Sequence, residues 1–184
     1  MKHTRYLAIA FAIALLFTTA CNNKQAEQTT TDLDTTEVAE TDTTIYGLCG
    51  EGTTMHSLEL VTSDGDTLTF EVGLDGEDEA VQGGLLSGDK LAVIKAYGYE
   101  EPTAAKVINL TTLEGKWTSL DRNFEIVEGG EVLSTIQSES NPYTSWRILN
   151  GHLLMGRDTF DILTLGADTL ELENSKGIFV YSRK

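Results

Sequence analysis

Thiol and imidazole groups are the side chains best suited to metal binding or nucleophilic catalysis, and this sequence has few of them. Its 184 residues include two cysteines and three histidines. Beyond the N-terminal segment there remain Cys49, His56 and His152, and none stands at zinc-ligand spacing from another. Cys49 has no partner thiol in a C-x-x-C motif, which predicts a buried packing role. His56 shares a strand face with two leucines, which predicts the rim of the core, and His152 follows a turn, which predicts exposure.

Carboxylates are the remaining candidates for chemistry, but no pair of them is singled out by its spacing. The chain has 29 acidic and 13 basic residues, a formal net charge of -16. The densest cluster, Asp75–Glu79, lacks the spacing and terminal glutamate of an EF-hand, which predicts a solvated loop. The negative charge excludes the usual nucleic-acid binder, which needs a basic stripe to displace counterions from phosphate. We therefore expect a protein that is not an enzyme, with no catalytic residue, metal site or cofactor.

The N-terminal segment has the parts of a secretory signal peptide. Lys2 and Arg5 give it a positive start, and the apolar run Tyr6–Phe17 follows. This run is shorter than the roughly 20 apolar residues that a membrane-spanning helix needs. We therefore expect a cleaved signal peptide over residues 1–20.

The end of this segment contains a cysteine in a distinctive place. Ala20-Cys21 resembles the lipobox of bacterial lipoproteins, with Thr18 where that family usually has leucine. The resemblance implies cleavage before Cys21, its acylation, and a stable membrane anchor, since each buried CH₂ contributes about 0.8 kcal/mol. Asn22-Asn23 stands in place of the aspartate that holds some lipoproteins at the inner membrane. The outer membrane is therefore the expected location, with the periplasmic or surface face left open.

Polar residues of low complexity follow the cysteine. The segment from Asn22 to Thr44 has six acidic residues, one lysine and very few large apolar side chains. Such a composition cannot bury enough surface to offset the entropy of ordering the chain. We therefore expect a disordered tether over residues 21–44 and folded domains after it.

Residues 45–112 predict a first β unit of five strands. Apolar side chains alternate with polar ones around Leu58 and Leu60, and again around Leu68 and Phe70, as in half-buried strands. Turn-forming residues separate these runs. The expected strands are 45–49, 57–62, 67–72, 90–97 and 104–110. Five strands in a segment of this length resemble a small OB-type barrel.

Residues 113–184 predict a second unit, a meander of eight short strands. Glycine-containing turns separate the runs, and Asn150-Gly151 is the strongest of them because a type I′ turn needs positive φ at both positions. The expected strands lie near 115–120, 123–128, 131–137, 144–149, 152–156, 159–165, 168–173 and 177–183. Eight antiparallel strands in sequence order close most economically into an up-and-down barrel.

The second unit opens with Gly115-Lys116-Trp117, which resembles the G-x-W first-strand signature of lipocalins. The resemblance implies that Trp117 closes one end of the barrel and that Arg183, near the chain end, lies across its ring. It covers residues 113–184, about half the length of a true lipocalin. Strands this short predict a barrel filled by its own side chains or one that holds a small apolar ligand.

Three functions fit these features. The chain as a whole resembles outer-membrane lipoproteins of the Bacteroidetes type, with an OB-like domain followed by a lipocalin-like domain. We favour a membrane-anchored, non-enzymatic binding module whose partner is a glycan or an envelope protein. The alternatives are a carrier of a small apolar ligand in the lipocalin-like barrel and an envelope stress or adhesion sensor.

Overall fold

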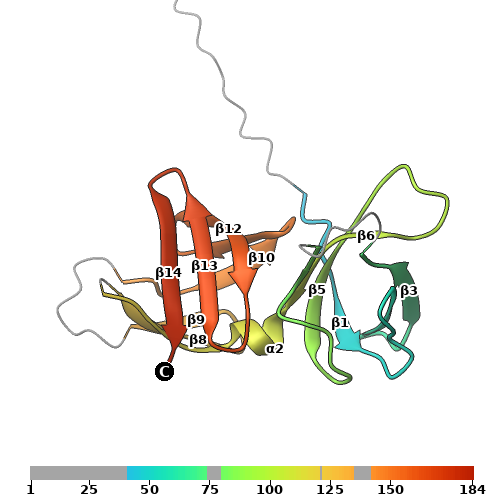
Figure 1. The fold of residues 1–184 in the computed structure, drawn as a ribbon, viewed down its shortest axis with the longest axis horizontal. Helices are drawn as coiled ribbons and strands as arrows, with labels where there is room; N and C mark the ends of the chain where they lie inside the picture. Colours follow the sequence, from blue (N-terminus) through green and yellow to red (C-terminus); the bar gives the residue numbers. More distant parts are fainter. Residues whose placement is uncertain (1–40, 74–79, 121, 135–141) are drawn as a thin grey trace, which may run out of the picture. The chain divides into compact units, whose positions relative to one another are not determined.

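The computed structural model describes residues 41–73, 80–120, 122–134 and 142–184 (Figure 1). The signal peptide, Cys21, the tether up to residue 40 and the acidic loop 75–79 lie outside the described residues. Within the described residues the protein is all-β, as predicted, with one four-residue helix, α2 (Leu110–Leu113), between its two sheets. No helix in this part of the chain is long and apolar enough to cross a membrane.

The N-terminal sheet has six strands of mixed orientation in the order β3-β2-β1-β5-β6-β4. Its neighbouring strands pair antiparallel, except that β4 runs parallel to β6. Five of the six strands coincide with the predicted runs, and β4 was not predicted. The bounds are β1 Ile45–Cys49, β2 Ser57–Thr62, β3 Thr67–Glu71, β4 Val81–Gln82, β5 Lys90–Lys95 and β6 Ala104–Asn109.

The sheet does not close, which corrects the prediction of a five-stranded barrel. Strand β4 pairs with β6 through Val81 and Val107, and so occupies the side of β6 that a closing strand would need. Strand β3 meets the start of β6 only through an isolated parallel bridge between Glu71 and Thr103. The backbone N–H of Glu71 donates to the carbonyl of Pro102 there, at 2.8 Å. Beyond that bridge, β3 is the outer strand of the sheet.

The C-terminal sheet has eight antiparallel strands in the order β10-β11-β12-β13-β14-β7-β8-β9, and it curls around one interior (Figure 1). Every pair of neighbours is consecutive in the chain except β14 and β7, the last and the first, so the meander is confirmed. The bounds are β7 Gly115–Thr118, β8 Asn123–Val127, β9 Glu131–Ser134, β10 Trp146–Leu149, β11 His152–Met155, β12 Asp158–Leu165, β13 Thr169–Asn174 and β14 Gly177–Arg183.

The eight strands form a nearly closed barrel. Strands β9 and β10 approach each other through one antiparallel bridge, Glu131 to Ser145. The N–H of Trp146 donates to the carbonyl of Gly130 at 2.8 Å, and its indole N–H donates to the carbonyl of Val127 at 2.8 Å. These contacts join the two outer strands at one end of the seam.

Alternation places one apolar face of every barrel strand in the interior. The buried side chains form a single cluster in which aromatic rings meet edge to face, as between Phe124 and Tyr181 at 4.9 Å. Ala92 and Ile108 of the first sheet belong to the same cluster. A second cluster, which includes Leu58 and other residues of β2, β3 and β5, forms the core of the first sheet.

Candidate functional site

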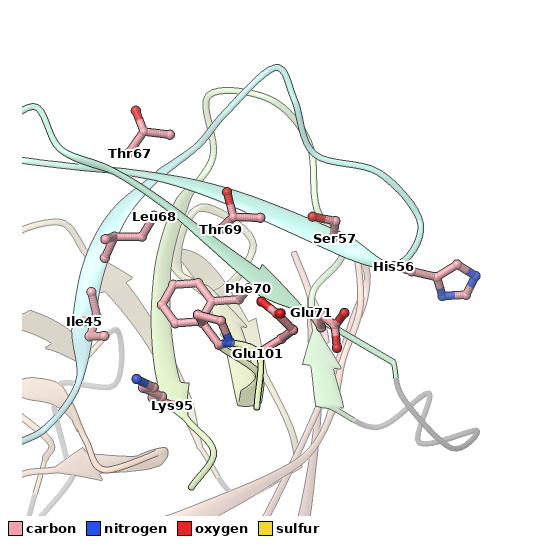
Figure 2. Close-up of a pocket in the computed structure, with 11 residues that line it drawn as sticks. Ile45, His56, Ser57, Thr67, Leu68, Thr69, Phe70, Glu71, Lys95 and Glu101 are labelled. Carbon is pink, nitrogen blue, oxygen red and sulfur yellow. The ribbon is translucent and has the colours of Figure 1, made fainter. Parts of the chain in front are cut away.

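A groove of about 780 Å³ runs along the outer strand of the first sheet (Figure 2). Strand β3 forms one side, and the ends of β1 and β5 with the loop before β6 form the other. Its floor is apolar and its rim carries charges. The lining residues are Ile45, His56, Ser57, Thr67, Leu68, Thr69, Phe70, Glu71, Lys95, Glu101 and Pro102.

A tight turn before β3 positions this strand beside β2. Gly65 has a φ of 86° and its N–H donates to the carbonyl of Thr62, which turns the chain back on β2. The alternation of residues 67–71 then directs the side chains of Leu68 and Phe70 toward the core and those of Thr67 and Thr69 to solvent. Phe70 is buried, yet its ring lies at the floor of the groove (Figure 2).

The pairing of β3 with β2 decides which backbone groups face the groove. Thr62 N–H donates to Asp66 O and Val72 N–H donates to His56 O, so the groups of residues 66 and 72 point at β2. Along an antiparallel pair, residues whose N–H and C=O point toward the partner strand alternate with residues whose N–H and C=O point away from it. In the register of β3 with β2, Thr67 and Thr69 are of the second kind, so their N–H and C=O point away from β2. The N–H of Glu71 also points away, and it donates to Pro102. The groove is therefore lined by backbone donors and acceptors as well as by side chains.

The loop between β5 and β6 forms the far side of the groove. Lys95, Glu101 and Pro102 line it, and all three are exposed. Two tyrosines of the same loop project into solvent, Tyr97 at 79% exposure and Tyr99 at 58%. Exposed aromatic rings of this kind offer flat apolar surface with a polar tip to a binding partner.

The groove carries two carboxylates, Glu71 and Glu101, and one ammonium group, Lys95. Residues 45–112 as a whole have 12 acidic and three basic side chains. A neutral or basic ligand therefore suits this surface better than an anionic one. His56 also lines the groove, but it is exposed and its imidazole points away from the other lining side chains (Figure 2).

The thiol and imidazole groups lie apart from one another. Cys49 is buried and its Sγ lies 3.4 Å from the hydroxyl of Thr53, as its packing role predicted. His56 is exposed, which corrects its expected place at the rim of the core, because β2 begins only at the next residue. His152 is exposed and its Nδ1 lies 2.7 Å from Asp161. No group of three or more metal-ligating side chains occurs among the described residues.

No family model, curated protein or solved structure matches this chain.

The structure brings Trp117 and Arg183 together. Trp117 is fully buried, and its indole N–H donates to the carbonyl of Leu113 at 2.8 Å. The guanidinium of Arg183 lies over its ring, in the register set by pairing of β14 with β7. Arg183 also donates to the carbonyl of Glu114 at 3.0 Å. These contacts are structural, and neither residue lines the groove.

The amino-acid sequence alone does not reveal the groove, although it contains one signal for it. Residues 67–71 contain no lysine or proline, the residues with which outer strands are commonly protected from pairing. That absence has meaning only for a strand known to be at an edge. The order of the strands, which sequence alternation does not specify, is what exposes β3.

Proposed function

We propose that this protein is a membrane-anchored lipoprotein of the bacterial cell envelope that acts as a non-enzymatic binding module. Its binding site is the groove along β3, and its partner is a macromolecule of the envelope. The observation that carries this proposal is the groove itself, in which an apolar floor lies beside strand backbone that pairs with no other strand among the described residues. The β5–β6 loop, which lines the groove through Glu101 and Pro102, also carries the exposed Tyr97 and Tyr99. The anchor is the acylated Cys21, which attaches the folded part to the outer membrane through the tether.

The strand order supports an OB-type origin for the first sheet. Without β4 the remaining strands run β3-β2-β1-β5-β6, and the bridge between Glu71 and Thr103 brings the two ends of this series together. OB-type folds are partly open barrels that bind oligonucleotides and oligosaccharides across their second and third strands and the nearby loops. The groove lies on β2, β3 and the loop between β5 and β6, the corresponding surface of this chain.

The packing of the eight-stranded barrel favours a binding module over the carrier of an apolar ligand. The near-closed meander with Arg183 over Trp117 supports a lipocalin-like fold for residues 113–184. Its interior, however, holds the protein's own large side chains, among them Phe124, Phe160 and Tyr181, in one buried cluster. A lipocalin-type ligand would have to displace these rings.

The proposal is tested by binding of the purified full chain to washed bacterial envelopes. The double variant Tyr97→Ser/Tyr99→Ser removes both exposed rings of the β5–β6 loop, which lines the groove through Glu101 and Pro102. Because each stacked aromatic contributes on the order of 1 kcal/mol, the loss is expected to be about tenfold or more. Leu120→Ser is the matched control, since Leu120 is fully exposed in the turn between β7 and β8, outside the first sheet, and should not affect binding. Equal binding by both variants, or no binding by the wild type, would refute the proposal.

A further inference from the structure

We propose that the groove takes an extended polypeptide segment, which pairs with β3 as an added strand. This inference rests on the proposed function and specifies the class of ligand. The segment has apolar residues at alternate positions and lysine or arginine between them. Three features of β3 and its surroundings lead to this ligand: a free backbone edge, the lack of protection along it, and the charge of the groove.

At Thr67 and Thr69, the outer edge of β3 pairs with no other strand among the described residues. The alternation of the β2–β3 pairs directs the N–H and C=O groups of these two residues away from β2, and both residues line the groove. They are spaced about 7 Å apart along the strand, the repeat of an antiparallel or parallel ladder. Another polypeptide backbone supplies donors and acceptors at that repeat, whereas a lipid or an oligosaccharide does not.

The chain itself begins such pairing at one end of the edge. Glu71 N–H donates to Pro102 O, and Glu71 forms a parallel bridge with Thr103. Before Pro102, the β5–β6 loop forms the far side of the groove, and Glu101 lies on that side. The groove therefore begins where this short internal pairing ends, and an added strand would extend it toward Thr67.

From Thr67 to Phe70, β3 carries none of the common protections of an outer strand. Outer strands are commonly shortened, bulged, or supplied with proline or lysine to prevent pairing with other chains. Strand β3 has five residues, Thr-Leu-Thr-Phe-Glu, and pairs with β2 in an unbroken register from Thr67 to Glu71. Strand β4, at the opposite edge, has only two residues, and the side chain of Gln82 accepts a hydrogen bond from Leu165 N–H at 2.9 Å. One edge is thus short and engaged, while the other is long and available.

The side chains of the groove define the sequence that an added strand would need. Ile45, Leu68 and Phe70 form an apolar floor that would receive every second side chain of the segment (Figure 2). Glu71 and Glu101 outnumber Lys95 at the rim, and the surrounding sheet is strongly acidic. Basic residues between the apolar ones therefore match the charge of this surface.

The test uses a synthetic seven-residue peptide in which lysine and valine alternate. Binding to the full chain is measured by fluorescence anisotropy of the labelled peptide. Thr69→Pro removes the outward N–H without touching the ladder to β2, because proline lacks that donor and is tolerated at edge positions. Thr69→Val keeps the N–H and is the matched control. We expect wild type and Thr69→Val to bind equally, and Thr69→Pro to bind at least about tenfold more weakly.

A second measurement uses the wild type alone, so that the test does not depend on correct folding of the proline variant. Amide hydrogen exchange at Thr67 and Thr69 in the wild type should slow when the peptide is added, since both N–H groups become hydrogen-bonded. Unchanged exchange at both, or equal binding of the peptide by folded Thr69→Pro and Thr69→Val, would overturn the inference.

An oligosaccharide probe separates this inference from the proposed function. Suppose a tetrasaccharide of N-acetylglucosamine binds, Tyr97→Ser/Tyr99→Ser abolishes its binding, and the peptide does not bind. The groove would then be a glycan site, so the added strand would be wrong and the binding module would stand. If neither probe binds, the added strand is also refuted, and the envelope assay alone decides the proposed function.

Discussion

The guanidinium carbon of Arg183 lies 4.3 Å from the centre of the Trp117 ring. The same guanidinium donates to three backbone carbonyls, those of Thr112, Glu114 and Ala167. Strand β14 pairs with β7 through only two residue pairs, so few ladder bonds hold the last strand to the first. One arginine therefore supplies much of the connection between the last strand of the chain and the first strand of the barrel.

Removing this side chain should weaken the barrel. Arg183→Ala loses a cation–π contact of about 0.5–2 kcal/mol and hydrogen bonds worth about 0.5–1.5 kcal/mol each. We expect the free energy of unfolding in urea to fall by about 2–4 kcal/mol. Arg157→Ala removes an exposed arginine between β11 and β12 and should change it by less than about 0.5 kcal/mol. Equal values for the two variants would show that the contact over Trp117 contributes nothing.

The β10–β11 turn gives a second prediction. Asn150 has a φ of 48°, and its side-chain oxygen accepts hydrogen bonds from the N–H and hydroxyl of Thr43. Asn150→Ala should cost about 1–2 kcal/mol of unfolding free energy, because alanine is strained at positive φ and makes no such bonds. Asn150→Gly also loses the bonds but relieves the strain, so it should cost clearly less. If both variants lose the same stability, backbone strain is not the cause.

An ion pair makes part of the stability depend on pH. The hydrogen bond from Lys176 Nζ to Asp158, 2.9 Å long, lowers the pKa of the Asp158 carboxyl below its usual value of 3.8. The native state therefore holds fewer protons than the unfolded state as pH falls past that value. The resulting stabilisation is present above about pH 4 and is lost as the pH falls through the native pKa.

A double-mutant cycle measures this pair. Asp158→Asn, Lys176→Met and the combined variant should give a coupling of a few tenths to about 1 kcal/mol at neutral pH, since Lys176 is largely exposed. The coupling should vanish at pH values below the native pKa of Asp158, where the carboxyl group is protonated. A coupling that persists there would mean that packing, and not charge, joins the two side chains.

The membrane anchor is tested by comparing the two cysteines. Cys21→Ala should abolish labelling of the protein by radioactive palmitate and release it from the membrane fraction. Cys49→Ala should leave both labelling and fractionation unchanged, because this thiol is buried in the first sheet. Palmitate incorporation that survives Cys21→Ala would contradict acylation at this position.

Local sequence patterns determined most of the strands. Alternation around Leu58 and Leu60 and the turn at Asn150-Gly151 depend on contacts between residues close in the chain, so they are readable from the sequence. The meander of the second unit follows for the same reason, since consecutive strands pair with each other. The burial of Trp117 and its meeting with Arg183 were expected from the family resemblance, and the pairing of β14 with β7 places them together.

Only the tertiary structure decided the features on which the proposed binding site depends. Strand β4 has two residues and no alternation, and contacts with residues far along the chain hold it, from Val81 to Val107 and from Gln82 to Leu165. Because β4 takes one side of β6, the first sheet does not close and Thr69 of β3 remains at an edge. Edge position and closure arise from pairing between distant segments, which local hydrophobic periodicity does not encode.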